Sequence, residues 1–125
     1  MKKVTGIGGI FFKTDDPKAT NDWYAKNLGL DTSDYGTTFE WKDADEVGNS
    51  GSTTWCTFPT DSENFHPSKK PFMINYRVVN LAMLLEELKK ENVTIVDKIT
   101  EYEYGKFLHI LDPEGNIIEL WEPKD

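Results

Sequence analysis

The order of hydrophobic and polar positions in the first half of the chain predicts one helix among three strands. The run TGIGGIFFK (5–13) is typical of a strand, and DDPKATNDWYAKNLGL (15–30) predicts a helix that Asp16 caps and Gly29 ends. Two further apolar runs separated by a polar turn predict strands: TTFEWKDA (37–44) and GSTTWCTFP (51–59). This half therefore has the order strand, helix, strand, strand.

The second half repeats this order after a polar connection, TDSENFHPSKK, at 60–70. Leucines spaced by three and four residues in NLAMLLEELKKEN (80–92), behind the cap Asn80, predict the strongest helix of the chain. Apolar runs on both sides of it predict strands: PFMINYRVV (71–79), VTIVDKI (93–99) and the hairpin GKFLHILDPEGNIIELWEP (105–123). One constant offset superposes Ile10 on Ile74, and the matching order of elements indicates an internal duplication.

Length and charge limit the possible classes of protein. We expect a single domain over 1–125, with module 1 at 1–59, a linker at 60–70 and module 2 at 71–125. The net charge of −8 argues against a nucleic-acid partner, because contacts with phosphates need a basic surface. No apolar run reaches the roughly 18 residues that a membrane helix needs, and no signal-peptide pattern opens the chain, so we expect no membrane partner. The single cysteine, Cys56, forms no disulfide within the chain and fits a cytoplasmic location.

Two motifs resemble those of a known family. The chain resembles the vicinal oxygen chelate superfamily, which includes glyoxalase I, bleomycin-resistance proteins and extradiol dioxygenases. The resemblance lies in the helix DDPKATNDWYAKNLGL after a first strand and in the ending LDPEGNIIELWEP. The resemblance covers essentially the whole chain. It implies an α+β fold of two βαβββ modules, a mixed sheet that curls around a cleft with helices on its outer face, and a homodimer.

The resemblance also implies four inward-facing positions that hold one divalent ion in metal-dependent members. These positions fall on Gly9, Trp55, Met73 and Glu119. Only Glu119 suits such an ion, because glycine has no side chain, indole offers no lone pair and a thioether is a soft donor. Zn²⁺, Mn²⁺ or Ni²⁺ need about three or more protein ligands. We therefore expect no metal cofactor, and we expect Trp55 to fill part of the metal position.

Alternation along the predicted strands assigns further side chains to the cleft. Apolar walls with a few polar groups are typical of small-molecule sites. The residues assigned to ligand binding are Phe11, Lys13, Trp55, Met73, Asn75, Arg77, Phe107 and Trp121. The alternative for each aromatic residue is packing in the interior, and the alternative for Lys13 and Arg77 is a solvated surface position. Tyr102 and Tyr104 could lie at the rim of the cleft or cover an edge of the sheet.

The hairpin at 105–123 contains the candidate catalytic pair. In its antiparallel register His109 lies directly opposite Glu119, so both side chains are expected in the cleft. The pair could transfer protons, orient a ligand, form a structural hydrogen bond or contribute to a metal site. The other histidine, His66, lies in the polar linker, whose composition explains it.

Three functions fit these features. The first is a metal-free binder of an aromatic or cationic small molecule, similar to bleomycin-resistance proteins, which the negative charge and the aromatic walls favour. The alternative is a glyoxalase-like lyase or isomerase that uses a relocated metal or a metal-free acid–base pair of His109 and Glu119. The third is a sensor or partner-binding domain without chemistry.

Overall fold

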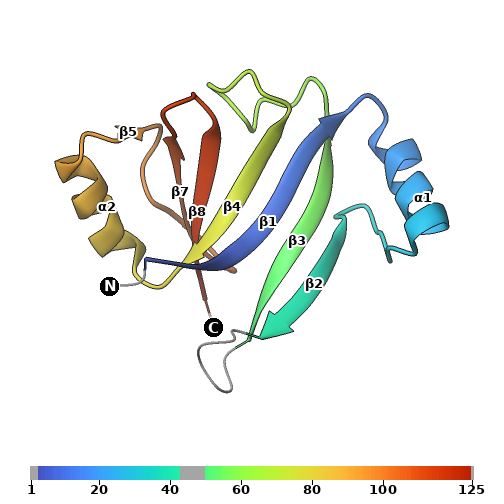
Figure 1. The fold of residues 1–125 in the computed structure, drawn as a ribbon, viewed down its shortest axis with the longest axis horizontal. Coiled ribbons are helices and arrows are strands. Elements are labelled where there is room, and N and C mark those ends of the chain that lie inside the picture. Colours follow the sequence, from blue (N-terminus) through green and yellow to red (C-terminus); the bar gives the residue numbers. More distant parts are fainter. Residues whose placement is uncertain (1–2, 43–49, 125) are drawn as a thin grey trace.

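The computed structural model describes residues 3–42 and 50–124, and in these ranges one open, mixed sheet of eight strands is accompanied by two helices (Figure 1). In chain order the elements are β1 (Val4–Thr14), α1 (Pro17–Leu28), β2 (Thr37–Lys42), β3 (Ser50–Pro59), β4 (Phe72–Val78), α2 (Leu81–Lys90), β5 (Thr94–Ile95), β6 (Thr100–Tyr102), β7 (Gly105–Leu111) and β8 (Ile117–Pro123). The predicted α+β class is confirmed. Residues 43 and 44 of the predicted strand at 37–44 lie outside the described ranges.

The two halves of the chain join at the centre of the sheet. The strand order is β2-β3-β1-β4-β8-β7-β5, and β6 pairs with β7 off this path. The first strands of the two halves, β1 and β4, pair antiparallel, and each has a parallel neighbour on its other side, β3 and β8 respectively. The sheet curves, and the two helices lie at its opposite ends, α1 near β3 and α2 near β7 and β8 (Figure 1).

Both helices begin where the sequence predicts. The Asp16 side chain accepts a hydrogen bond from the Ala19 N–H at 3.1 Å, and Gly29 ends α1 in the left-handed conformation with φ of 74°. The Asn80 side chain accepts from the Met83 N–H at 3.1 Å and caps α2. Within the described ranges neither helix has the length and apolar character needed to cross a membrane.

Side chains on the two faces of β4 and β8 pack into separate clusters. On one face, Leu81 and Leu84 of α2 pack with strand residues that include Leu108 and Leu120. On the other face, Met73 and Ile117 pack with Phe65. Phe65 belongs to the connection between the halves and is fully buried, so this connection closes one end of the second face.

Candidate functional site

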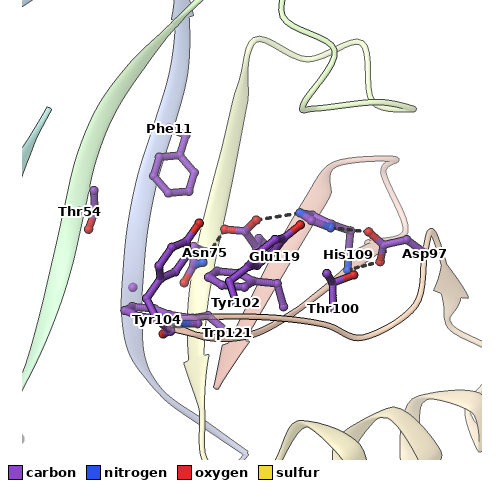
Figure 2. A pocket seen from close by; sticks show the side chains of 12 residues that line it. Phe11, Thr54, Asn75, Asp97, Thr100, Tyr102, Tyr104, His109, Glu119 and Trp121 are labelled. Carbon is purple, nitrogen blue, oxygen red and sulfur yellow. Dashed lines mark hydrogen bonds and ion pairs between the residues drawn. The ribbon is translucent and has the colours of Figure 1, made fainter. Parts of the chain in front are cut away.

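The face of the sheet turned away from α2 contains a pocket of about 370 Å³. It is formed within one chain by strands of both halves and by the segment between β5 and β7. Its lining residues are Gly8, Phe11, Thr54, Asn75, Asp97, Thr100, Tyr102, Tyr104, Phe107, His109, Glu119 and Trp121 (Figure 2). Its size and its mixture of aromatic and polar groups are typical of small-molecule sites.

Four polar side chains form a hydrogen-bonded line along the floor of this pocket (Figure 2). Asn75 Nδ2 donates to Glu119 Oε1 at 2.6 Å, and Glu119 Oε2 lies 2.8 Å from His109 Nε2. On the other side of the imidazole, His109 Nδ1 lies 2.7 Å from Asp97 Oδ2. The His109 backbone N–H also donates to Asp97 Oδ1 at 2.8 Å. His109 is therefore held between two carboxylates.

Strand pairing produces this line. His109 of β7 lies directly opposite Glu119 of β8, as the sequence predicts, and Asn75 of β4 is in register with Glu119 on the other side. The Val96 N–H donates to the His109 carbonyl at 2.9 Å, which brings the next residue, Asp97, beside the imidazole. Residues in register on neighbouring strands share a face of the sheet, so these side chains meet in the pocket.

The two carboxylates determine the charge of His109. Burial lowers the pKa of this imidazole, but hydrogen bonds and charge attraction from Glu119 and Asp97 outweigh burial and raise the pKa above its ordinary value of 6.5. In its protonated form the imidazole donates from both ring nitrogens, one to each carboxylate. With both carboxylates ionised, the floor of the pocket carries a net negative charge.

Asn75 contains a buried polar atom without a partner. The residue is 2% exposed, and Asn75 Oδ1 has no hydrogen-bond partner among the described residues. A Cβ atom at Gly8 would collide with this oxygen and would lie 2.9 Å from the Trp121 ring. Glycine at position 8 therefore leaves the space in which the Asn75 amide can turn its nitrogen toward Glu119. An unpaired buried acceptor costs free energy, so a donor brought close to it would be stabilising.

Four aromatic side chains form the wall above the acidic floor. The rings of Phe107 and Trp121 stack with 6.0 Å between centroids and 7° between planes. Tyr102 and Tyr104 stack at 5.8 Å, and both contact the Phe107 ring. Tyr102 is 51% exposed and Tyr104 60%, so the outer part of this wall is open to solvent. Such a surface suits contact with a flat ligand.

Most residues predicted for the cleft lie in or beside this pocket. Those that line it are Phe11, Asn75, Phe107, His109, Glu119 and Trp121. Arg77 is buried and lines a neighbouring cavity that shares Trp121 with the pocket. Position in the pocket does not by itself establish a role, so the catalytic and ligand-binding roles of these residues stay predictions.

The orientation predicted for Trp55 is wrong. In the parallel register of β3 with β1, Trp55 lies beside Ile10, and it is Thr54 that lies beside Gly9 and lines the pocket. The Trp55 ring packs on the opposite face, 4.8 Å from the ring of Tyr24 in α1. A constant sequence offset does not fix the register of a strand, and a shift of one residue moves a side chain to the other face.

The prediction that Met73 and Lys13 line the pocket is also wrong. Met73 is 3% exposed and packs against Phe65 and Ile117, because the connection between the halves covers this end of the face. The Lys13 ammonium lies over the Phe65 ring, 5.4 Å from its centroid. Both side chains contact Phe65 instead of the pocket.

Asp97 is the functional candidate that sequence reasoning missed. It follows the short strand β5, which pairs antiparallel with the part of β7 that follows His109. One sequence feature could have indicated this position. The apolar run VTIV (93–96), directly before Asp97, can pair as a strand with the apolar residues next to His109. Tyr102 and Tyr104, whose position the sequence left open, lie at the pocket wall.

The residues present do not fit a divalent metal ion. The row across the sheet is Thr54, Gly9, Asn75 and Glu119, which contains one carboxylate. Each Glu119 oxygen accepts a single protein hydrogen bond and keeps further acceptor capacity, but His109 uses both ring nitrogens on carboxylates, so neither nitrogen is free to join Glu119 as a metal ligand. Within residues 3–42 and 50–124 no group of three or more His, Cys, Asp or Glu side chains is arranged to hold a metal.

Comparison with solved structures finds the same fold in enzymes of low sequence identity. Methylmalonyl-CoA epimerase from Mycobacterium tuberculosis has a TM-score of 0.65 and 19% identity, over 100% of this chain and 92% of that one. A variant of the Streptomyces coelicolor methylmalonyl-CoA epimerase, in complex with 2-nitronate-propionyl-CoA, has a TM-score of 0.69 and 12% identity, over 98% and 99% of the two chains. At such identities the likeness establishes the fold and not the activity.

Comparisons at the level of the family agree with this fold. A glyoxalase/bleomycin resistance protein/dioxygenase superfamily member from Vibrio splendidus has a TM-score of 0.60 and 10% identity, over 93% and 97% of the two chains. A search of curated proteins finds no match. The sequence model of the Glyoxalase/Bleomycin resistance protein/Dioxygenase superfamily matches residues 6–120. The chain therefore belongs to this superfamily.

Proposed function

We propose that the protein binds a small organic molecule in the pocket without a metal ion, and that the ligand has a flat apolar part and a cationic or N–H-donating group. The observation that carries the proposal is the position of Glu119, a carboxylate held by Asn75 and His109 on the floor of an aromatic pocket. A carboxylate fixed in this way attracts a donor or a positive charge.

The aromatic wall supports the flat part of the ligand. Phe107 and Trp121 present stacked rings, and Tyr102 and Tyr104 extend this surface toward solvent. Contact with aromatic rings is favourable for apolar planes and also for cations, which are attracted to the face of the ring. The wall and the floor therefore favour the same kind of ligand.

Charge supports the cationic or donating group. A protonated His109 would compensate only one of the two carboxylates beside it, so the floor favours a positive group in either protonation state of the imidazole. The chain as a whole carries a net charge of −8, which raises the local concentration of cations around it. Asn75 Oδ1 adds a buried acceptor close to the same carboxylate.

A titration with a charged probe and its neutral analogue tests this proposal. N-methylquinolinium should quench tryptophan fluorescence saturably and bind about tenfold more tightly than neutral quinoline, a difference of ~1.4 kcal/mol. The Glu119→Gln variant should lose this preference, whereas Glu114→Gln, in the exposed turn before β8, should keep it. Equal affinities for the two probes in the wild-type protein would contradict the charge argument.

A second candidate function is metal-free proton transfer by Glu119 and His109. The observation that favours it is the Asp97 carboxylate behind His109, because such a group orients an imidazole and stabilises its protonated form. In this function Glu119 would take a proton from a C–H bond next to a carbonyl and return a proton to the same carbon. Since the structural neighbours include methylmalonyl-CoA epimerases, methylmalonyl-CoA is a suitable first substrate.

Exchange of solvent deuterium into that substrate separates the two functions. Proton transfer predicts deuterium at the carbon between the carbonyl groups, lost in Glu119→Gln and retained in Glu114→Gln. Binding without exchange would leave the first function as the better account.

We also propose that the protein forms a homodimer, as the family resemblance implies. The pocket does not require it, because residues of one chain form its wall and its floor. Light scattering on the purified protein would measure the oligomeric state.

A further inference from the structure

A second cavity of about 380 Å³ lies beside the pocket. It shares Tyr104 and Trp121 with the pocket, so the Trp121 ring forms part of the wall between them. Its lining residues are Glu40, Gly51, Ser52, Arg77, Tyr104, Trp121, Pro123 and Lys124. Arg77 and Lys124 make the chemistry of this cavity different from the acidic floor of the pocket.

Arg77 is a buried cation with an uncommon environment. The residue is 9% exposed, and its guanidinium carbon lies over two tryptophan rings, 5.0 Å from the Trp121 centroid and 5.9 Å from the Trp41 centroid. Contact with an aromatic ring involves the face of the planar guanidinium and leaves the N–H groups at its edge. These donors need acceptors that lie in the plane of the group.

The described residues supply no anionic partner for this edge. None of the ion pairs within residues 3–42 and 50–124 involves Arg77. Glu40, which lines the same cavity, is exposed to solvent, where its charge is screened. A buried charge without a partner is costly, so an anion that reaches the guanidinium edge gains a strong interaction.

We propose that this cavity is a subsite for an oxyanion, a carboxylate or a phosphate, bound in the plane of the Arg77 guanidinium. Arg77 lies two residues after Asn75 on β4, so the subsite and the acidic floor belong to one face of the same strand. The proposed anion site at Arg77 does not depend on the proposed function of the pocket. A single ligand that spans the pocket and the subsite is a further step, and this step rests on the proposed function. Such a ligand carries a donor or cation near Glu119, an anionic group near Arg77 and a flat part along Trp121.

A purely structural role for Arg77 is the competing account. In that case the guanidinium fills space between Trp41 and Trp121, and the cavity accepts apolar groups without regard to charge. The two accounts differ in their response to ligands of the same shape and different charge. Charge-assisted hydrogen bonds contribute about 1.5–3 kcal/mol, which corresponds to roughly ten- to a hundredfold in affinity.

The test is an NMR titration of the ¹⁵N-labelled protein with benzoate, phenyl phosphate and neutral benzamide, followed at the indole N–H signals of Trp41 and Trp121 and at the Arg77 Nε–H. At least one anion should shift these signals saturably and bind about tenfold or more tightly than benzamide. The stronger of the two anions identifies the ligand group as a carboxylate or a phosphate. Equal shifts by benzamide, or no saturable shift by either anion, would overturn the subsite.

A matched pair of variants locates the effect at the cavity without removing Arg77. Ser52 lines the cavity on β3, so Ser52→Glu places a carboxylate there, and Ser52→Gln adds a neutral side chain of the same size. Anion binding should be lost in Ser52→Glu and retained in Ser52→Gln, and equal binding by both variants would contradict the assignment. Failure of the proposed function is distinguishable, because N-methylquinolinium reports on the pocket floor, whereas benzoate and phenyl phosphate report on Arg77.

Discussion

Glu119 Oε2 lies 2.8 Å from His109 Nε2, and this contact joins the two strands of the terminal hairpin at the floor of the pocket. Asp97 approaches the other ring nitrogen, and Asn75 approaches the other oxygen of Glu119. Each of the two titratable groups at the centre is therefore bound on both sides by protein. This arrangement gives the floor of the pocket a fixed position and leaves neither ring nitrogen of His109 free as a metal ligand.

The titration of His109 tests the arrangement of its neighbours. Because Glu119 and Asp97 raise the pKa of His109, its imidazole signals should titrate above the ordinary value of 6.5. Asp97→Asn and Glu119→Gln should each lower this pKa. The chain has two histidines, so NMR resolves both titrations easily, with His66→Gln providing the assignment. A His109 pKa below the ordinary value would show that burial outweighs the carboxylates.

The same interaction makes stability depend on pH. Since the pKa of His109 is higher in the folded chain than in the unfolded chain, its ion pairs stabilise the fold fully below about pH 6.5. This contribution is lost as the pH rises through the raised pKa of the folded state. Urea unfolding of the wild-type protein and His109→Gln should therefore show a stability difference that shrinks at alkaline pH. A difference that grows with pH would mean that the neutral imidazole is the stabilised form.

Two tryptophans should respond differently to the same substitution. Trp121 lines the pocket, so Trp121→Leu should weaken N-methylquinolinium binding by about tenfold, the size expected for one cation–π contact. Trp55 packs against Tyr24 of α1, so Trp55→Leu should lower the unfolding free energy by about 1–3 kcal/mol and leave the affinity unchanged. Fluorescence titration and urea unfolding of both variants measure the two effects. Weaker binding in Trp55→Leu would restore the orientation predicted from the sequence.

Gly8 should be required for the position of the Asn75 amide. A Cβ atom at this position collides with Asn75 Oδ1, so Gly8→Ala should destabilise the protein by about 1–3 kcal/mol. In an Asn75→Ala background the collision with Oδ1 is absent and only the contacts with the Trp121 ring and Arg77 Cγ remain, so the cost of Gly8→Ala should fall in part. A double-mutant cycle by urea unfolding measures this coupling. The same cost in both backgrounds would show that the Trp121 ring, and not the amide, requires glycine.

The sequence predicts both helices, the longer strands and one pair of the site because these depend on local signals, whereas the strand predicted at 93–99 is only Thr94–Ile95 and β6 is not predicted. The caps Asp16 and Asn80 fix the starts of the helices, and the turn at 112–115 fixes the register of the hairpin. Once that register is known, His109 must lie opposite Glu119, because the pairing of a tight hairpin leaves little freedom. The pairing of His109 with Glu119 therefore depends only on neighbouring residues of one hairpin.

The remaining features depend on contacts between distant segments. The face on which Trp55 lies is set by the parallel pairing of β3 with β1, which no local signal fixes. The burial of Met73 depends on Phe65, which a polar connection carries over the sheet. Asp97 reaches His109 through the short pairing of β5 with β7. Such long-range registers are decided by packing of the whole sheet, so sequence offsets do not predict them reliably.

The most direct test of metal-independent binding is the affinity for N-methylquinolinium, measured by tryptophan fluorescence on protein treated with EDTA and again with excess Zn²⁺ or Mn²⁺. We predict saturable binding after EDTA treatment, an affinity that the added metals leave unchanged, and a marked loss of affinity in Glu119→Gln. Binding that appears only with an added metal ion, or that persists fully in Glu119→Gln, would contradict the account of the site.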